Sequence, residues 1–448
     1  MNSFLYNLFL HTVAAPFLSL YYLPRILFGG KYRRSLPGKL GRLDPAFDPE
    51  SIPRPRAWFH AVSVGEVVAL GPLVKALKAL LPSAGIIVST GTETGQDKAR
   101  DLIEDADGFL YLPLDFPAFV KPVVQRIQPD LFVMMETELW PNLIGSLKLR
   151  NAAIALANGR ISDRSFPRYR LMRRFFAPTL NLMDLFLMSS DLDAQRIRDM
   201  GVPQDRIRVT GNTKFDAALA GTSEEAERRI RTLLGIEPGE QVFIAGSTHP
   251  GENEIVLDAY QELTKTFPNL ILILAPRHVE KTPQVLTIMQ ERGMAEPFLR
   301  SSADRGEQRN GRKVVIVDRT GELFHVFSLA SVVFMGGSLV PRGGQNILEP
   351  AARGKVVLFG PSMEDFRDAK EVLVRTGAGI EIRGAHDLAA RVAEFLANSE
   401  KADRLGKAGR DELAKHTGSA RRTAELLTDL IAARETFTAE SAEDAEKR

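Results

Sequence analysis

The chain contains no cysteine in 448 residues. This absence excludes a disulfide framework, a thiol nucleophile and any thiolate-bound metal. Histidine is also sparse, with seven residues of which no two stand four positions apart as a helical zinc pair would. Neither a dinucleotide-binding G-x-G-x-x-G loop nor a Walker loop occurs, and GTETG at 91–95 lacks their spacing. We therefore predict neither a resident metal nor another cofactor.

Net charge is small as well, at +2, but it is unevenly distributed. Residues 1–215 hold 27 Lys and Arg against 20 Asp and Glu, and the rest of the chain is net negative. A basic first half predicts an anionic surface or ligand there. The composition, 44 % hydrophobic and 25 % charged, is typical of a globular protein of two or three domains.

The N-terminus carries a membrane signal. Residues 4–23 lack a formally charged side chain and, as a helix, reach about 30 Å, one hydrocarbon core. The basic residues that begin at Arg25 predict a cytoplasmic location for the rest of the chain. Pro16 interrupts the segment and its polar side chains fall on one side of the helix, so a helix that lies in the plane of the membrane is an alternative to one that spans it. A buried core helix is the third interpretation. We expect residues 1–30 to anchor the protein at the inner membrane, on anionic lipid and not on nucleic acid.

The remainder predicts an α/β protein. Short runs of Val, Ile and Leu alternate with helical patterns, which indicates parallel sheets covered on both faces. The series breaks near 216–235, where a polar stretch reads as a linker. We predict domains over 31–215 and 216–430, followed by a disordered polar tail over 431–448.

Unusual loops follow the strands, where parallel sheets bind their ligands. HAVSVGE ends at Glu66, which is either a helix-start carboxylate kept ionised by the helix dipole or a general base. ETELW, which contains Glu136, adds acids that are either functional or salt-bridged. Six arginines over 160–174 accompany one acid, and they form either a solvated face or a phosphate site.

The second half contains glycine-rich loops. In GGSLVPRGGQNILEPAARG at 336–354, Gly343 and Gly344 permit close backbone approach, and a helix is expected near Gln345. Glu349 could accept ribose hydroxyl protons, and GSTHPGE and APRH add further donors. The pattern predicts a nucleotide-sugar site, with a structural glycine turn as the alternative.

Eight segments together resemble 3-deoxy-D-manno-octulosonic acid (Kdo) transferases of lipid A assembly. In order from about 31 to 425, they are HAVSVGE, STGTETG, ETELWPN, NGRISDRSF, GNTKFD, GSTHPGE, APRH and GGSLVPRGGQNILEP. The resemblance implies a GT-B glycosyltransferase, with two Rossmann-like domains facing across a cleft. It implies a bisphosphorylated lipid A precursor as acceptor on the first domain and CMP-Kdo as donor on the second.

The resemblance also implies roles for residues. Glu66 takes the place of the proton acceptor, and Glu136 and Lys214 match residues that support the transition state. The matched CMP contacts are Pro276, Arg277, Thr320, Gly321, Glu322, Asn346, Ile347, Leu348 and Glu349. The chain departs from the family at Thr320, where some members have Met, and at Gly159, where Ala is common.

These roles imply an inverting reaction in lipopolysaccharide biosynthesis. Glu66 removes a proton from an acceptor hydroxyl, whose oxygen displaces CMP through an oxocarbenium-like transition state. Two alternatives remain open at this point, a GT-B enzyme that uses a UDP-sugar, such as a lipid A disaccharide synthase-like protein, and a non-catalytic lipid-binding module. The number of Kdo units transferred is also open.

Overall fold

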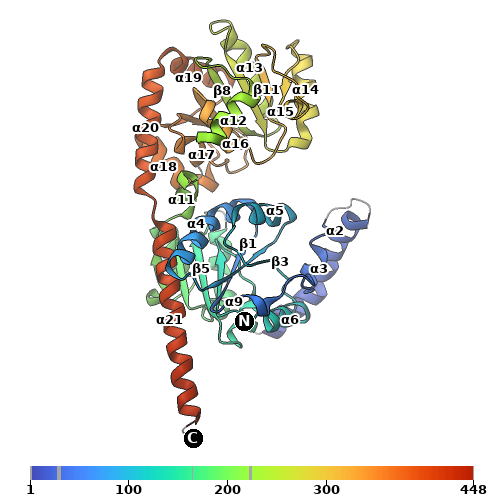
Figure 1. Ribbon diagram of the computed structural model, residues 1–448, viewed down its shortest axis with the longest axis vertical. Helices are drawn as coiled ribbons and strands as arrows, with labels where there is room; N and C mark the ends of the chain where they lie inside the picture. The colour runs from blue at the N-terminus through green and yellow to red at the C-terminus, as the bar shows by residue number, and fades with distance from the viewer. Residues whose placement is uncertain (1–2, 28–31, 164, 221–223, 447–448) are drawn as a thin grey trace. The chain divides into compact units, whose positions relative to one another are not determined.

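The computed structural model describes residues 3–27, 32–163, 165–220 and 224–446 (Figure 1). The chain divides into two compact units. Unit 1 comprises Met1–Ala217 and Thr417–Arg448, and unit 2 comprises Ala218–His416. Each unit contains one seven-stranded sheet.

The sheet of unit 1 is parallel throughout, in the order β3-β2-β1-β4-β5-β6-β7. Its strands are almost entirely buried because helices cover both faces, which explains the continuous apolar runs. The strands are β1 (Arg56–Ala61), β2 (Gly85–Thr90), β3 (Gly108–Tyr111), β4 (Leu131–Met135), β5 (Ala153–Gly159), β6 (Leu185–Met188) and β7 (Ile207–Val209). The helices are α3 (Leu36–Lys39), α4 (Val64–Leu80), α5 (Glu93–Leu102), α6 (Pro117–Ile127), α7 (Pro141–Lys148), α8 (Phe166–Leu171), α9 (Arg173–Leu180), α10 (Asp191–Asp199) and α11 (Thr213–Ala220).

The sheet of unit 2 has the order β10-β11-β9-β8-β12-β13-β14 and is also parallel. Its strands are β8 (Val242–Thr248), β9 (Ile271–Pro276), β10 (Phe298–Leu299), β11 (Val314–Ile316), β12 (Val332–Met335), β13 (Val357–Phe359) and β14 (Gly379–Glu381). The helices are α12 (Glu224–Leu234), α13 (Glu252–Thr264), α14 (Thr282–Glu291), α15 (Arg300–Ala303), α16 (Leu323–Val326), α17 (Leu348–Ala352), α18 (Arg367–Thr376), α19 (Ala385–Ala397) and α20 (Ser399–Lys415). In both sheets the carboxyl ends of all strands lie on one edge, where the candidate loops therefore gather.

The C-terminal helix α21 (Ser419–Glu446) crosses the expected boundary between the second domain and the tail (Figure 1). It belongs to unit 1, not to the second domain, because Ala424, Leu427 and Ile431 are buried in the core beside α4. The guanidinium of Arg422 also donates to the Thr210 carbonyl at 2.8 Å. The sequence predicts a disordered tail from residue 431, but the helix continues to Glu446. The sequence of this part is rich in the helix formers Ala and Glu.

The N-terminal segment consists of α1 (Ser3–Phe9), a π-helical turn (Leu10–Ala14) and α2 (Ala15–Leu27). One side docks on unit 1, where the Tyr6 hydroxyl donates to Asp115 at 2.8 Å and Leu10 is buried. Side chains such as those of Leu8 and Phe17 are exposed. Among the described residues, no helix combines the length and the apolar character that crossing a bilayer requires.

Candidate active site

Glu66 lies in the first turn of α4, directly after β1. Ser63 caps this helix, and its hydroxyl donates to Oε1 of Glu66 at 3.0 Å. The backbone N–H of Val62 donates to Oε2 at 2.8 Å. Ser63 Oγ also accepts the Glu66 N–H at 3.5 Å, so Glu66 does have the helix-start role that its sequence position suggests. Each carboxylate oxygen retains a further lone pair for another donor.

The surroundings of Glu66 also change its acidity. Burial raises the pKa of Glu66 to about 7, and the charge of Glu136 acts in the same direction. The bonds from Val62 and Ser63 and the charge of Lys214 partly oppose this rise in pKa. This carboxylate is therefore only partly ionised at neutral pH, in contrast with the expectation that the helix dipole keeps it ionised, because desolvation has the larger effect. A pKa near 7 suits a general base.

Glu136 and Lys214 form an ion pair beside Glu66. Nζ of Lys214 donates to Oε1 of Glu136 at 2.6 Å. Glu136 follows β4 in a left-handed conformation with φ of 58°, which is strained for this residue type, while its N–H bonds the Ala157 carbonyl. The start of α11 is fixed by Asn158, whose side-chain oxygen accepts the Thr213 N–H. The structure thus brings together all three residues predicted as catalytic.

Glu138 is a further carboxylate here that the sequence analysis did not single out. Burial raises the pKa of Glu138 to about 7, and the charge of Glu66 contributes. Glu138 in turn raises the pKa of Tyr169 on α8, after the effect of burial. These mutual effects place Glu66, Glu136 and Glu138 in one electrostatically coupled group. The second acid of ETELW, two residues after Glu136, was the signal that could have identified it.

In unit 2 the loops after β8, β9 and β12 are tied together. The N–H of Arg277 donates to the Thr248 carbonyl at 2.9 Å, and the rings of His249 and His278 pack edge to face. The side chain of Gln345 lies 3.4 Å from Nε2 of His249. Pro276 ends β9, so Pro276 and Arg277 lie at this edge as predicted.

Positive charge concentrates on these loops. Burial lowers the pKa of His249, and the nearby His278, Arg342 and Arg277 lower it further, while Glu252 opposes them. Arg277 and Arg342 are exposed, and neither has an ion pair in the described part of the chain. Sequence reasoning did not single out Arg342, although it lies within the glycine-rich loop. Two exposed guanidinium groups suit a phosphate ligand.

Glu252 organises the glycine-rich loop from below. Its carboxylate is fully buried and accepts four backbone N–H groups, those of His249, Gly337, Ser338 and Leu339, at 2.7 to 3.0 Å. A Cβ on Gly336 would lie 2.6 Å from the Ser247 carbonyl oxygen, so the chain passes very close here. Glu252 therefore fixes the shape of residues 336–339.

Residues 346–349 differ in part from expectation. Helix α17 begins at Leu348, not near Gln345, and has only five residues. Asn346 donates to Glu349 at 3.0 Å, and the side chains of Ile347 and Leu348 are buried. Those two side chains hold the segment in place and are not presented to a ligand.

The paired glycines of this loop are explained by protein contacts. A Cβ on Gly343 would meet the Asp365 carboxylate at 2.4 Å, and one on Gly344 would meet the Met363 sulfur at 2.5 Å. Both glycines also have positive φ. The space that they leave is filled by the loop after β13, so close approach of a ligand is not needed to account for them.

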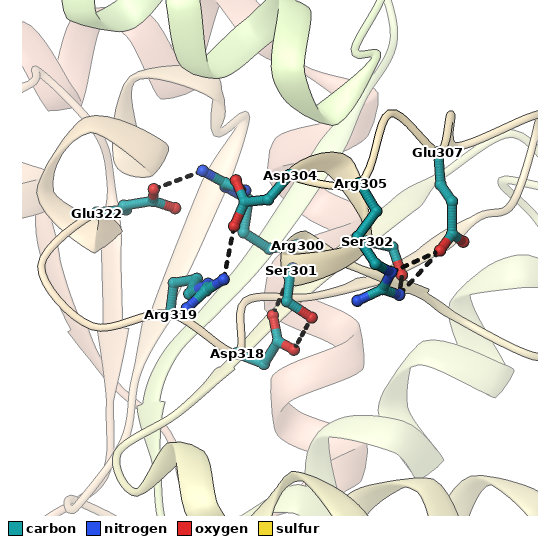
Figure 2. A network of polar contacts seen from close by, with 9 residues as sticks. All are labelled: Arg300, Ser301, Ser302, Asp304, Arg305, Glu307, Asp318, Arg319 and Glu322. Atoms are coloured by element: carbon teal, nitrogen blue, oxygen red, sulfur yellow. Dashed lines mark hydrogen bonds and ion pairs between the residues drawn. The ribbon is translucent and has the colours of Figure 1, made fainter.

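The loop after β11 is held by a polar network (Figure 2). Buried Arg300 bonds both Asp304 and Glu322 at 2.7 Å, and Asp318 accepts from Ser301. Glu322 is thus engaged within the protein, whereas Thr320 and Gly321 lie exposed at the tip of the loop. Among the described residues, no group of three or more His, Asp and Glu side chains is arranged to hold a metal ion.

Comparison with known proteins agrees with this arrangement. The family profile described as 3-Deoxy-D-manno-octulosonic-acid transferase (kdotransferase) matches residues 34–217. A 3-deoxy-D-manno-octulosonic acid transferase of Haemophilus influenzae is 35 % identical over 89 % of this chain and 91 % of its own. The chain belongs to the Kdo transferase family. The Chlamydophila psittaci transferase of the same name is 32 % identical over 85 % of each chain.

Solved structures agree on the fold of this Kdo transferase family member. A glycosyltransferase from Rickettsia africae has a TM-score of 0.57 at 12 % identity and covers 84 % of this chain and 98 % of its own. A UDP-GlcNAc 2-epimerase from Neisseria meningitidis has a TM-score of 0.59 at 12 % identity, with 84 % and 100 % covered. At this identity the likeness concerns the fold alone. The predicted GT-B class, with two Rossmann-like parallel sheets, is confirmed.

Proposed function

We propose that the protein transfers Kdo from CMP-Kdo to a hydroxyl of a bisphosphorylated lipid A precursor, lipid IVA, with inversion at the anomeric carbon. Membership of the Kdo transferase family supports the transferred sugar. The observation that carries the chemistry is the buried Glu66 carboxylate, whose pKa is about 7, beside the Lys214–Glu136 ion pair. The reaction belongs to lipopolysaccharide biosynthesis.

In the proposed step, Glu66 accepts the proton of the acceptor hydroxyl. The hydroxyl oxygen forms a bond to the anomeric carbon of Kdo while the bond from that carbon to the CMP phosphate oxygen breaks. CMP leaves with the electron pair, and Glu66 carries the proton. Lys214 keeps Glu136 neutralised, which limits the repulsion between Glu136 and the ionised Glu66.

The donor is assigned to the loops of unit 2. The charges of Arg277 and Arg342 both lower the pKa of His249, so the two guanidinium groups lie near the same ring. They could bind the CMP phosphate and stabilise its growing charge. The exposed tip at Thr320 and Gly321 and the Asn346–Glu349 pair are the further proposed CMP contacts. Glu322, Ile347 and Leu348 would act by holding these loops, not by side-chain contact.

The direct test is mass spectrometry of a tetraacyl lipid A precursor after incubation with CMP-Kdo. We expect the acceptor mass to rise by one or more Kdo residues, and the number of additions is read from the same spectrum. CMP should inhibit the reaction, and UDP should not. Inhibition by UDP alone would favour a UDP-sugar transferase, and binding of the acceptor without release of CMP would favour a lipid-binding module.

We further propose that the N-terminal segment holds the enzyme on the cytoplasmic face of the inner membrane, lying along the surface. The docking of Tyr6 on Asp115 fixes one side, and Leu8, Phe17 and Leu20 are exposed on the segment. Burial of such side chains in a bilayer interface is favourable. Phe17→Ser combined with Leu20→Ser should reduce sedimentation with phosphatidylglycerol vesicles and leave the reaction in detergent unchanged. Unchanged sedimentation would exclude this segment as the membrane contact.

A further inference from the structure

An arginine-lined hollow lies on unit 1, formed by α8, α9 and the end of α10 with the turn that follows it. Its cavity measures about 380 Å³. Arg170, Arg173, Arg174 and Arg198 line it, with Asp199 as the one acid in the lining. We call this hollow the arginine basin. Three members come from the predicted cluster over 160–174, and Arg198 comes from a helix that the sequence did not connect with it.

The basin arginines are not used inside the protein. None of the four guanidinium groups has a hydrogen bond or an ion pair with any described residue, in contrast with that of neighbouring Arg196, which donates to the Ile161 carbonyl and pairs with Asp163. Pairing with internal acids therefore does not account for these positions. Four guanidinium groups around one cavity repel one another unless an anion lies between them.

A second hollow, where apolar side chains stand beside two of the same arginines, adjoins the basin. It measures about 550 Å³, shares Arg170 and Arg173 with the basin, and adds Phe166, Pro167 and Leu171. Leu171 is 87 % exposed, and the next residue, Met172, is 46 % exposed. A ligand that fills both hollows has an anionic group next to an apolar portion. Guanidinium groups bind phosphate in a bidentate manner, which makes phosphate the matching anion.

The helices that line the basin also contact the proposed catalytic group and the N-terminal segment. Tyr169, also on α8, interacts electrostatically with Glu138 of the catalytic group. Phe175 on α9 contacts the ring of Tyr6 from the N-terminal segment. A phosphate held at the basin could therefore belong to an amphiphile that is being modified or to one that forms the surrounding membrane.

We propose that the arginine basin binds the phosphomonoester group of a membrane amphiphile. The phosphate belongs either to the acceptor or to a lipid of the bilayer, and only this choice of source rests on the proposed function. The chemistry is the same in both cases: several guanidinium groups hold the phosphate, and the apolar side chains of the second hollow, Phe166, Pro167 and Leu171, contact the adjoining hydrocarbon.

The test replaces three of the four basin arginines in the full-length protein, as Arg170→Gln, Arg173→Gln and Arg174→Gln together. The control removes three charges from exposed side chains of unit 1 that line neither hollow, as Lys121→Gln, Arg126→Gln and Arg150→Gln. One measurement is sedimentation with phosphatidylcholine vesicles that contain phosphatidic acid. The other is the KM for a phosphorylated lipid A precursor dispersed in detergent, without a bilayer.

We expect the basin variant to lose roughly tenfold or more in at least one measurement, since each charged hydrogen bond to phosphate is worth about a factor of ten before solvent screening. A higher KM in detergent assigns the phosphate to the acceptor. Weaker vesicle binding with an unchanged KM assigns it to the bilayer. The control should change by less than about twofold in either measurement, because it removes the same bulk charge without a site.

The proposal is overturned if neither measurement changes, or if the control changes as much as the basin variant. A melting temperature that falls only in the basin variant, with both measurements unchanged, would show that the arginines stabilise the fold instead. Failure of the wild-type protein to transfer Kdo would remove the proposed function but would leave the vesicle measurement as a valid test of the basin.

Discussion

Two glutamates occupy equivalent places in the two units and have different surroundings. Glu66 follows β1 and Glu252 follows β8, each directly after a glycine and in the first turn of a helix. Each preceding strand lies between two neighbours, β2 and β4 in one sheet and β9 and β12 in the other. Glu66 accepts from Val62 and Ser63, whereas Glu252 is fully buried and accepts four backbone N–H groups.

The difference comes from the neighbouring loop in each sheet. After β12 the chain turns its N–H groups of residues 337–339 toward Glu252, so this carboxylate organises a loop. After β4 the chain instead presents Glu136, whose charge raises the pKa of Glu66 in addition to the effect of burial. The same Gly-Glu helix start thus produces a structural anchor in unit 2 and a carboxylate with a raised pKa in unit 1.

The largest expected effect is that of Glu66→Gln. The amide keeps the shape and an oxygen acceptor for the cap but cannot accept the substrate proton. We expect kcat to fall by about 10²–10⁴-fold, the usual contribution of general base catalysis, while binding of CMP is unchanged. Steady-state kinetics and calorimetry with CMP measure the two quantities. Wild-type turnover in this variant would reduce Glu66 to a structural carboxylate like Glu252.

Replacing one or the other member of the Lys214–Glu136 ion pair should shift the pKa of Glu66 in opposite directions. Lys214→Met leaves Glu136 uncompensated and should raise the pKa of Glu66, because Lys214 lowers it and Glu136 raises it in the wild type. Glu136→Gln should lower that pKa. We expect activity of Lys214→Met below pH 7 to fall about fivefold, the equivalent of roughly 1 kcal/mol for a partly exposed pair. Shifts of the same sign in both variants would contradict this electrostatic account.

Glu252→Gln should affect binding more than chemistry. The amide nitrogen cannot accept from the backbone N–H groups, so part of the loop at 337–339 loses its partner. A buried unsatisfied group costs about 1–3 kcal/mol, which should appear as lower stability of unit 2 and a higher KM for the donor. At saturating donor, kcat should stay near the wild-type value. A fall in kcat as large as that of Glu66→Gln would remove the distinction between the two glutamates.

The smallest expected effect is that of Glu138→Gln on the pH dependence of the unfolding free energy. Its pKa is raised from 4.5 to about 7, so between these values the folded protein binds more protons than the unfolded chain, and stability falls as pH rises. Glu138→Gln does not titrate. Its stability relative to the wild type should therefore increase from pH 5 to pH 8, by the order of 1 kcal/mol once solvent screening is included. Denaturant titrations at the two pH values measure this difference, and a constant difference would argue against the raised pKa.

Much of the fold could be predicted because parallel strands buried on both faces are plainly apolar in sequence. Glu66 and Glu136 could be singled out because each stands in a motif directly after a strand or at a helix start, whereas Lys214 was identified only through the resemblance to Kdo transferases. The membership of α21 in unit 1 was not predictable, since its buried face at Ala424 and Leu427 does not indicate which sheet it covers. The roles of Glu322 and Glu252 depend on partners far away in sequence, Arg300 and the loop after β12, and spacing alone does not reveal them.

The central claim is that Glu66 is the proton acceptor and has a pKa of about 7. The most direct measurement is the pH dependence of kcat/KM for Kdo transfer between pH 5 and 9, in the wild type and in Glu66→Gln. The account predicts that wild-type activity rises about tenfold per pH unit below pH 7 and levels off above it, and that this rise disappears in the variant. A flat wild-type profile, or a rise near pH 7 that persists in Glu66→Gln, would contradict it.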